Sequence, residues 1–274
     1  MFFTRLMSSI ILVILSLITI LTGGYVLAAV LLVLAVIAFQ ELMLACKLAE
    51  KGQKSNPLML VGYVGIILYY VLMTFLTDRV WLFLAAILIL ILFMFVYVFA
   101  FPKYRAEQIM CAFFCVAYAP VMLSFIYMVR SLPYGIYTVW MIFISSWICD
   151  TCAYVVGMLF GKHKLAPVLS PKKSIEGAIG GIVGSALVGA LYAYFIVEPV
   201  IQEQHVTWIF VLISGVGAII AQVGDLAASA IKRNHYIKDY GKLIPGHGGI
   251  MDRFDSVIFT APMIYFLTLL LINR

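Results

Sequence analysis

The amino-acid sequence predicts an all-α, polytopic integral membrane protein with about nine transmembrane helices. Of its 274 residues, 65% are hydrophobic and only 11% are charged, and the mean hydropathy is +1.13. Such a composition lies outside the range of soluble proteins and is typical of membrane proteins. The sequence also lacks a polar linker that would divide it. We therefore expect residues 1–274 to form a single integral membrane domain.

Nine apolar runs are long enough to cross a bilayer, which takes about 20 residues. They cover residues 7–23, 25–45, 57–77, 80–101, 107–129, 134–159, 175–197, 207–227 and 256–272. The first run follows Arg5 and imitates a signal peptide, but no A-x-A cleavage site comes after it. We therefore expect it to be a retained helix.

The basic residues divide sharply between the two sides that nine spans define. Fifteen of the eighteen Lys and Arg residues fall on the side of the N-terminus, and only Arg79, Arg130 and Arg274 fall on the other. Because Lys and Arg are enriched in cytoplasmic loops, we expect a multi-pass protein of the plasma membrane with a cytoplasmic N-terminus and an outside C-terminus. The net charge of +6 then reflects topology, and we expect no nucleic-acid partner.

The cysteines and glycines of the apolar runs indicate helix packing. All five cysteines lie in or beside these runs, so a disulfide framework is not expected. Cys149 and Cys152 form a C-x-x-C inside a span, where small packing residues are favoured over a redox pair. The run 175–197 carries two overlapping G-x-x-x-G spacings, formed by Gly177, Gly180, Gly181 and Gly184. This spacing indicates close contact with a neighbouring helix.

Three carboxylates lie within predicted spans, where each costs about 2.5–3.5 kcal/mol on insertion scales unless it has a partner or a role. Glu41 is interpreted as a buried polar group bonded to a neighbouring helix. For Asp150, a structural hydrogen-bonding node and a place in a functional site are equally consistent with the sequence. The third, Asp225, closes a span and leads directly into a charged loop.

Asp225 shares a helix face with Ser229, Lys232 and Arg233 if its helix continues beyond the apolar run. The loop that follows, "SAIKRNHYIKDYGKLIPGHGGIMDRFD" at 229–255, holds eight of the thirty charged residues of the chain. The charge split places this loop on the cytoplasmic side. An active site is therefore expected at the cytoplasmic face.

The glycines and acids at the end of this loop suit phosphate and metal chemistry. Gly246, Gly248 and Gly249 would let the backbone approach a phosphate closely. Asp252 and Asp255 lie three residues apart, on one face if a helix begins here. Hard carboxylate oxygens of this kind suit Mg²⁺ together with substrate phosphates.

A second polar loop, 161–177, lies on the same predicted side. Ser170 can cap a helix, and Pro171 suits the first helical position, followed by Lys172 and Lys173. A helix N-terminus with two lysines would seat a phosphate. The alternative is that the lysines contact lipid headgroups, with Glu176 forming an ordinary i, i+4 pair with Lys172.

These residues together favour phosphoryl or nucleotidyl transfer onto a lipid. A transporter whose intramembrane acids carry ions is the alternative class. It is less favoured because the sequence has no internal repeat and its polar residues gather at one face.

The arrangement S-x-x-K-R-x4-K-D-x-G-x2-I-P-x-H-G-G-x2-D-R-x-D, from Ser229 to Asp255, resembles the signature of the phosphatidate cytidylyltransferases, also called CDP-diacylglycerol synthases. "SPKKSIEG" at 170–177 and "SSWICDTCAY" at 145–154 resemble two further motifs of that family. These motifs cover the last half of the chain, so the resemblance implies a catalytic half at about 134–274.

The resemblance implies transfer of the cytidylyl group of CTP to phosphatidate, giving CDP-diacylglycerol and diphosphate. It also implies Mg²⁺, a lipid bilayer and a homodimer, and it disfavours a CTP-dependent lipid kinase. By the resemblance, Asp225 and Asp252 hold the metal, Asp150 and Asp255 are the alternative ligands, and Lys232 and Arg233 join in catalysis. The substrate-binding residues would be Ser170, Lys172, Lys173, Ser174, Glu176, Ser229, Lys238, Asp239, His247, Gly248, Gly249 and Arg253.

Overall fold

The computed structural model describes residues 13–50, 56–201, 205–244 and 248–272. Within these residues, eight helices are long and apolar enough to cross a membrane, and each coincides with one predicted span. The predicted span at 7–23 lies only partly in the described residues, where Val13–Thr22 is helical. The prediction of an all-α polytopic membrane protein is therefore confirmed.

The chain folds into two compact units. Unit 1 comprises residues 1–127 and 235–253, and unit 2 comprises residues 128–234 and 254–274. Each unit is thus built from one long stretch and one short stretch of sequence. The signature segment, from Ser229 to Asp255, contributes residues to both units.

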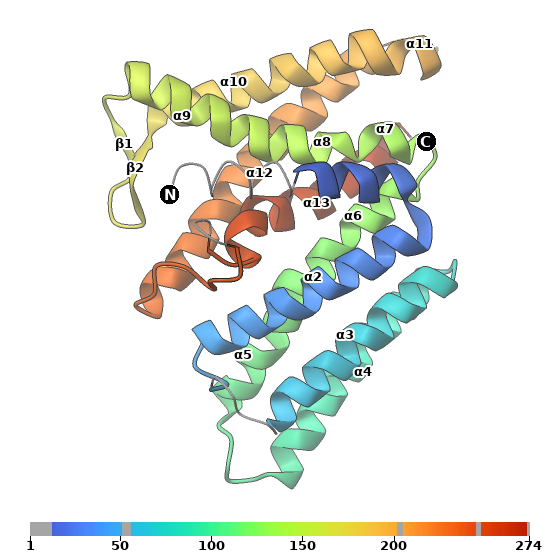
Figure 1. The fold of residues 1–274 in the computed structure, drawn as a ribbon, viewed down its shortest axis with the longest axis vertical. Helices are drawn as coiled ribbons and strands as arrows, with labels where there is room; N and C mark the ends of the chain where they lie inside the picture. Colours follow the sequence, from blue (N-terminus) through green and yellow to red (C-terminus); the bar gives the residue numbers. More distant parts are fainter. Residues whose placement is uncertain (1–12, 51–55, 202–204, 245–247, 273–274) are drawn as a thin grey trace. The chain divides into compact units, whose positions relative to one another are not determined.

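Unit 1 contains the first helices of the chain, which run side by side (Figure 1). These are α2 (Gly24–Ala45), α3 (Pro57–Phe75), α4 (Val80–Phe99) and α5 (Ala106–Val116), followed by a π-helical turn, η1 (Ala117–Val121), and most of α6 (Met122–Arg130). The start of α3 is set by local chemistry, because the Asn56 side chain accepts a hydrogen bond from the Leu58 amide at 3.0 Å. Pro57 then occupies the first helical position, where its missing N–H costs nothing.

A π-helical turn interrupts the span that contains α5 and α6. Pro120 lies inside this turn and has no N–H to donate to the helix. The hydroxyl of Tyr70, on α3, donates to the Pro120 carbonyl at 3.0 Å, deep in the core of unit 1. A side chain from a neighbouring helix thus hydrogen-bonds the backbone at the irregular turn.

Unit 2 contains the later helices and a short hairpin. In chain order its elements are α7 (Gly135–Thr138), α8 (Trp140–Phe143), η2 (Ile144–Ile148), α9 (Cys149–Phe160), β1 (Lys164–Ala166), β2 (Ser170–Ser174), α10 (Ile175–Tyr192), η3 (Ala193–Val197), α11 (Glu198–Ile201), α12 (Val206–Asn234) and most of α13 (Met251–Leu271). The helices α9 and α10 lie side by side and are joined by the antiparallel β1–β2 hairpin (Figure 1). Helix α12 packs against α10 and η2.

Glycines let α9 and α10 approach each other closely. A Cβ at Gly181 would lie 2.9 Å from the Cys149 sulfur, and one at Gly184 would collide with Cys152. The cysteines therefore fill space against the glycines of the opposite helix. Both predictions, close packing through the G-x-x-x-G spacings and a packing role for Cys149 and Cys152, are confirmed.

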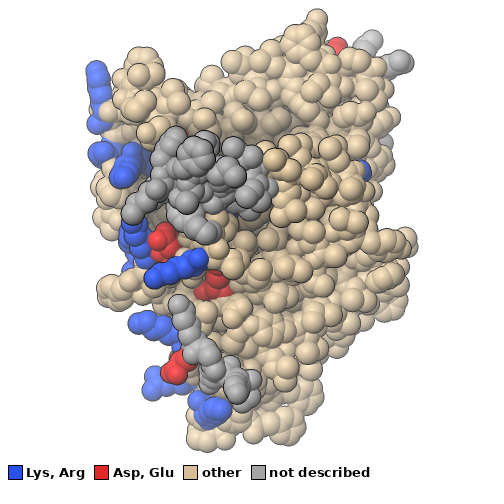
Figure 2. All heavy atoms as spheres, in the orientation of Figure 1, with Lys and Arg blue, Asp and Glu red and all other residues tan. Residues whose placement is uncertain are grey.

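The surface is largely apolar, as a bilayer requires. On α4, for example, Phe83 and Phe99 are 71% and 81% exposed. Most of the face shown in Figure 2 carries no charge, and some of its Lys and Arg side chains lie where Figure 1 places the β1–β2 hairpin. Four lysines of unit 2, at positions 162, 164, 172 and 173, lie in or next to the hairpin that joins α9 to α10.

Candidate active site

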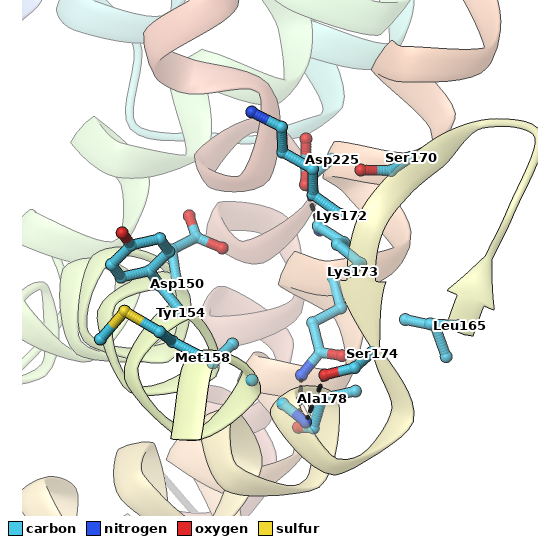
Figure 3. A pocket seen from close by; sticks show the side chains of 14 residues that line it. Asp150, Tyr154, Met158, Leu165, Ser170, Lys172, Lys173, Ser174, Ala178 and Asp225 are labelled. Atoms are coloured by element: carbon cyan, nitrogen blue, oxygen red, sulfur yellow. Dashed lines mark hydrogen bonds and ion pairs between the residues drawn. The ribbon is translucent and has the colours of Figure 1, made fainter. Parts of the chain in front are cut away.

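A cavity of about 420 Å³ lies in unit 2, between α9, the hairpin, α10 and α12. Its polar lining residues are Asp150, Tyr154, Ser170, Lys172, Lys173, Ser174, Gln222 and Asp225. Figure 3 shows Asp150 and Tyr154 on α9 at one side, and Ser170, Lys172 and Lys173 on β2 at the other. Six of the predicted site residues, drawn from separate sequence motifs, are thus brought into one cavity.

An ion pair between Lys173 and Asp225 crosses this cavity (Figure 3). The two side chains are 26% and 23% exposed, so both the ammonium and the carboxylate remain accessible from the cavity. Lys172, the preceding residue of β2, is exposed and lines the same space. The cavity therefore presents two cationic groups beside one carboxylate that is already paired.

The lysines are held by a hairpin, and the predicted helix start at Ser170 is wrong. Ser170–Ser174 is strand β2, paired with β1, and α10 begins only at Ile175. The N-terminal cap is Ser174, whose hydroxyl oxygen accepts a hydrogen bond from the Gly177 amide at 3.1 Å. Short polar strands carry little hydrophobic pattern, and the Ser-Pro pair fits a helix start equally well.

Glu176 fixes the base of this hairpin. Its carboxylate accepts hydrogen bonds from the Lys162 and His163 amides at 3.1 and 3.2 Å and contacts His163 Nδ1 at 2.6 Å. The alternative considered for Glu176, an ordinary i, i+4 pair with Lys172, is wrong, because Lys172 lies on a strand. Substrate binding by Glu176 stays a prediction; the observed contacts show it positioning the hairpin.

Close packing also holds Ser174 in place. A Cβ at Gly157, Gly161 or Gly177 would approach the Ser174 oxygen to 3.0, 2.7 or 2.9 Å. Side chains at these positions would push β2 away from α9 and open the cavity. The glycines thus set the distance between the lysines and the opposite wall.

Carboxylates of unit 2 provide the donor set expected for a hard cation. Asp150 and Asp225 line the cavity. The Asp255 carboxyl group, on α13, lies within electrostatic range of Asp225, Lys232 and Asp150. Neighbouring carboxylates repel unless a cation reduces their charge, and Mg²⁺ prefers such oxygens. The residues present therefore fit Mg²⁺, and Asp150 and Asp225 are the carboxylates that would hold it in the cavity.

The predicted continuation of the helix beyond Asp225 is confirmed. Helix α12 extends to Asn234, so Ser229, Lys232 and Arg233 follow Asp225 on a continuous helix. Ser229 and Lys232 are partly buried and Arg233 is exposed. None of these three lines the cavity, and their predicted roles stay predictions.

The remaining signature residues belong to unit 1. Lys238, Asp239 and Arg253 are exposed there, and His247 lies outside the described residues. Gly248 has a φ of +85°, a left-handed conformation in which a side chain would be strained. The glycine here is therefore explained by the backbone, and phosphate binding at this position stays a prediction.

Asp252 organises the signature segment through its own carboxylate. Its Oδ2 atom accepts hydrogen bonds from the amides of Tyr240 at 2.8 Å and Gly249 at 3.0 Å. Asp225 and Asp252 belong to different units, and the joint metal site predicted for them stays a prediction.

Glu41 is a buried polar group bonded to a neighbouring helix, as predicted, and the structure identifies its hydrogen-bond partners. Its carboxylate, 6% exposed, accepts hydrogen bonds from the amides of Ile250 at 3.1 Å and Met251 at 2.9 Å, at the start of α13. A Cβ at Gly241 or Gly249 would overlap this carboxylate. Two glycines of the signature segment are thus required by a glutamate far away in sequence.

Gln222 is a cavity residue that the sequence analysis missed. Its Nε2 atom donates to the Ala178 carbonyl at 2.9 Å and lies 3.4 Å from Cys149 Sγ, which ties α12 to α10 and α9. The signal was present in the sequence, because a polar side chain three residues before Asp225 lies on the same helix face.

The fold and the cavity together define a polytopic membrane protein with a pocket suited to phosphate groups and a hard cation. The model of the cytidylyltransferase family matches residues 3–271, so the chain belongs to this family. The resemblance inferred from the motifs is thereby confirmed at the level of the family.

Curated relatives carry a more specific description. The phosphatidate cytidylyltransferase of Staphylococcus haemolyticus is 38% identical over 162 residues, which is 59% of this chain and 60% of the relative. Proteins of the same description from Staphylococcus epidermidis and Staphylococcus aureus are 39% and 40% identical over 163 and 158 residues, covering 59% and 57% of this chain. The chain matches these relatives over about 60% and 58% of their length.

Proposed function

We propose that this protein transfers the cytidylyl group of CTP to phosphatidate, giving CDP-diacylglycerol and diphosphate. The observation that carries the proposal is the cavity in which Lys172, Lys173, Asp150 and Asp225 converge. Membership of the cytidylyltransferase family and the description shared by the relatives support the same substrates. Mg²⁺ and the lipid bilayer belong to this proposal.

The Lys173–Asp225 ion pair offsets two charges of the cavity against each other, and it suggests how a nucleotide would bind. A triphosphate brings several negative charges, which attract the ammonium groups of Lys172 and Lys173. As Lys173 turns to a phosphate oxygen, Asp225 loses its partner. Asp225 and Asp150 would then hold Mg²⁺, which when bound supplies positive charge to the polyphosphate. The triphosphate and the cation would therefore bind together.

The chemical step needs little from the protein beyond positioning and charge. An oxygen of the phosphatidate phosphate attacks the α-phosphorus of CTP. The bond between the α-phosphorus and the oxygen that bridges it to the β-phosphorus breaks, and diphosphate leaves with the electron pair. The attacking group is a phosphate monoester with a second pKa of about 6, so it is already an oxyanion at neutral pH. No general base is required. Lys172 and Lys173 offset the negative charge that builds up on the phosphates.

The reaction is tested by incubating the purified protein with CTP labelled at the α-phosphate and with phosphatidate. The proposal predicts that the label enters the lipid and depends on Mg²⁺. Label recovered in CDP would show a CTP-dependent lipid kinase, and an absence of turnover would favour a transporter. Either result would contradict the proposal.

We further propose that the protein lies in the plasma membrane with its N-terminus in the cytoplasm and its C-terminus outside, which the charge split of the loops supports. A reporter fused after Arg274 should then be found outside, and one inserted near Lys51 should be found inside. Both reporters on the same side would contradict this topology. The family resemblance also supports a homodimer, for which the mass of the detergent-solubilised protein should equal two chains.

A further inference from the structure

Three cysteines of unit 1 converge, and none of them is among the residues that line the cavity of unit 2. Cys46 follows the end of α2, and Cys111 and Cys115 lie one turn apart on α5. Their sulfur atoms all lie within 4.8 Å of one another, and all three thiols are free. Residues that are 65 and more positions apart in the sequence thus meet at one place.

This cluster differs from the packing cysteines of unit 2. Cys149 and Cys152 each fill space against a glycine of α10. By contrast, Cys46, Cys111 and Cys115 face each other, and the first two are partly exposed while the third is buried. Two of the three residues are therefore partly accessible, and among the described residues no glycine of a facing helix accounts for the position of their sulfurs as it does for Cys149 and Cys152.

The spacing suits a metal ion that prefers sulfur. In a tetrahedral zinc site the Zn–S distance is about 2.3 Å, which places neighbouring sulfurs about 3.8 Å apart. The observed cluster is within about 1 Å of that arrangement, so small side-chain rotations would complete it. Thiols that gather without forming disulfides are also typical of metal sites in reducing compartments.

A histidine of unit 1 lies in the neighbourhood of the thiols, although its nitrogens are not among the ligand atoms that lie within 4.8 Å of one another. The imidazole of His235 lies within electrostatic range of the Cys111 thiol, and His235 belongs to unit 1 together with the three cysteines. His235 is the first residue after α12 and precedes the signature residues Lys238 and Asp239. Three sulfurs and one imidazole nitrogen form a common ligand set for structural zinc.

We propose that Cys46, Cys111, Cys115 and His235 bind one thiophilic divalent cation of the Zn²⁺ class. The ion would join the end of α2 to α5 and, through His235, fasten the part of the signature segment that follows α12 to both. This site is separate from the Mg²⁺ site of the proposed reaction, because its donors are soft sulfurs and the cavity donors are carboxylate oxygens. It does not depend on the reaction being the one proposed.

The test uses the purified full-length protein in detergent, with reductant and excess Mg²⁺ to occupy carboxylate sites. After equilibration with Zn²⁺ and desalting, one equivalent of zinc should remain per chain. Loading with Co²⁺ should produce the sulfur-to-metal charge-transfer absorption of thiolate coordination. Replacing Cys111→Ser or Cys115→Ser should abolish both signals, and His235→Ala should weaken Zn²⁺ affinity by about tenfold or more.

The matched control is Cys152→Ser, which changes a cysteine of unit 2 and should keep the bound zinc. The melting temperature of each metal-free variant shows whether it is folded. A measurement on the unchanged protein removes any dependence on the variants: Zn²⁺ should slow alkylation of Cys46 and Cys111 by a maleimide, but not that of Cys152. Zinc retained by the Cys111→Ser variant, or no protection of Cys46 and Cys111, would overturn the proposal.

Discussion

Removing the Glu41 carboxylate should weaken the attachment of the signature segment to α2. This carboxylate is the acceptor for the Ile250 and Met251 amides, and it is almost fully buried. Glu41→Ala leaves both amides without this acceptor, and each buried, unsatisfied donor costs about 1–3 kcal/mol. We therefore expect a loss of about 2–6 kcal/mol in the free energy of unfolding. Glu41→Gln keeps one acceptor oxygen and should lose about half as much.

A double-mutant cycle with Gly249 separates this contact from a general loss of packing. A methyl group at Gly249 would overlap the Glu41 carboxylate, so Gly249→Ala alone should be destabilising. In the presence of Glu41→Ala the same methyl group finds space. The double variant should therefore be more stable than the sum of the two losses predicts, by about 0.5–3 kcal/mol.

The free energy of unfolding of the four proteins of the cycle and of the Glu41→Gln variant is measured in detergent, by denaturant unfolding followed by tryptophan fluorescence. A Glu41→Ala variant within about 0.5 kcal/mol of the unchanged protein would refute the role of the carboxylate, since that is the range of ordinary surface substitutions. Additive losses in the double variant would show that Gly249 is required for some other reason.

Two further predictions concern the cavity. Replacing both Lys172 and Lys173 by Gln should raise the KM for CTP by about tenfold or more, which corresponds to about 1.4 kcal/mol of lost phosphate binding, and should leave the KM for phosphatidate nearly unchanged. Lys164→Gln, in the other strand of the same hairpin, is the matched control, and an equal effect on both substrates would indicate contact with lipid headgroups instead. Asp225→Asn should abolish most turnover and shift the Mg²⁺ dependence of what remains, whereas Asp78→Asn at an exposed loop should do neither. Normal turnover with an unchanged Mg²⁺ requirement would remove Asp225 from the site.

The helices were predictable because the bilayer makes a strong demand on composition. A span needs about 20 apolar residues, and such runs are visible without knowledge of any contact. Helix packing was predictable for a similar reason, since the spacing of Gly177, Gly181 and Gly184 places small residues on one face of α10. The structure adds the partners of these glycines, because Gly181 and Gly184 face Cys149 and Cys152 on α9.

The hairpin could not be predicted from the sequence. The residues that form strand β2 were expected to begin a helix instead. Strands β1 and β2 contain three and five residues, and neither shows an alternating apolar pattern. Their pairing depends on contacts such as those of Glu176 with Lys162 and His163, which join residues 13 or 14 positions apart. The two lysines were identified from their type and place, but the element that presents them was not.

Contacts between segments that are distant in the sequence could not be predicted either. Glu41 was recognised as a buried polar group, yet its partners at Ile250 and Met251 lie more than 200 residues away. The convergence of Cys46 with Cys111 and Cys115 depends equally on the packing of α2 against α5. Periodicity and motifs describe single segments, so such pairings become visible only in the folded chain.

The central claim is that the cavity of unit 2 holds the phosphates of CTP, and chemical footprinting of lysines in the unchanged protein tests it most directly. The acylation rates of Lys172, Lys173 and Lys164 would be followed by mass spectrometry with and without CTP and Mg²⁺. CTP should protect Lys172 and Lys173 by about tenfold or more, while Lys164 reacts at the same rate. Acylation rates of Lys172 and Lys173 that stay the same when saturating CTP and Mg²⁺ are added would contradict the claim.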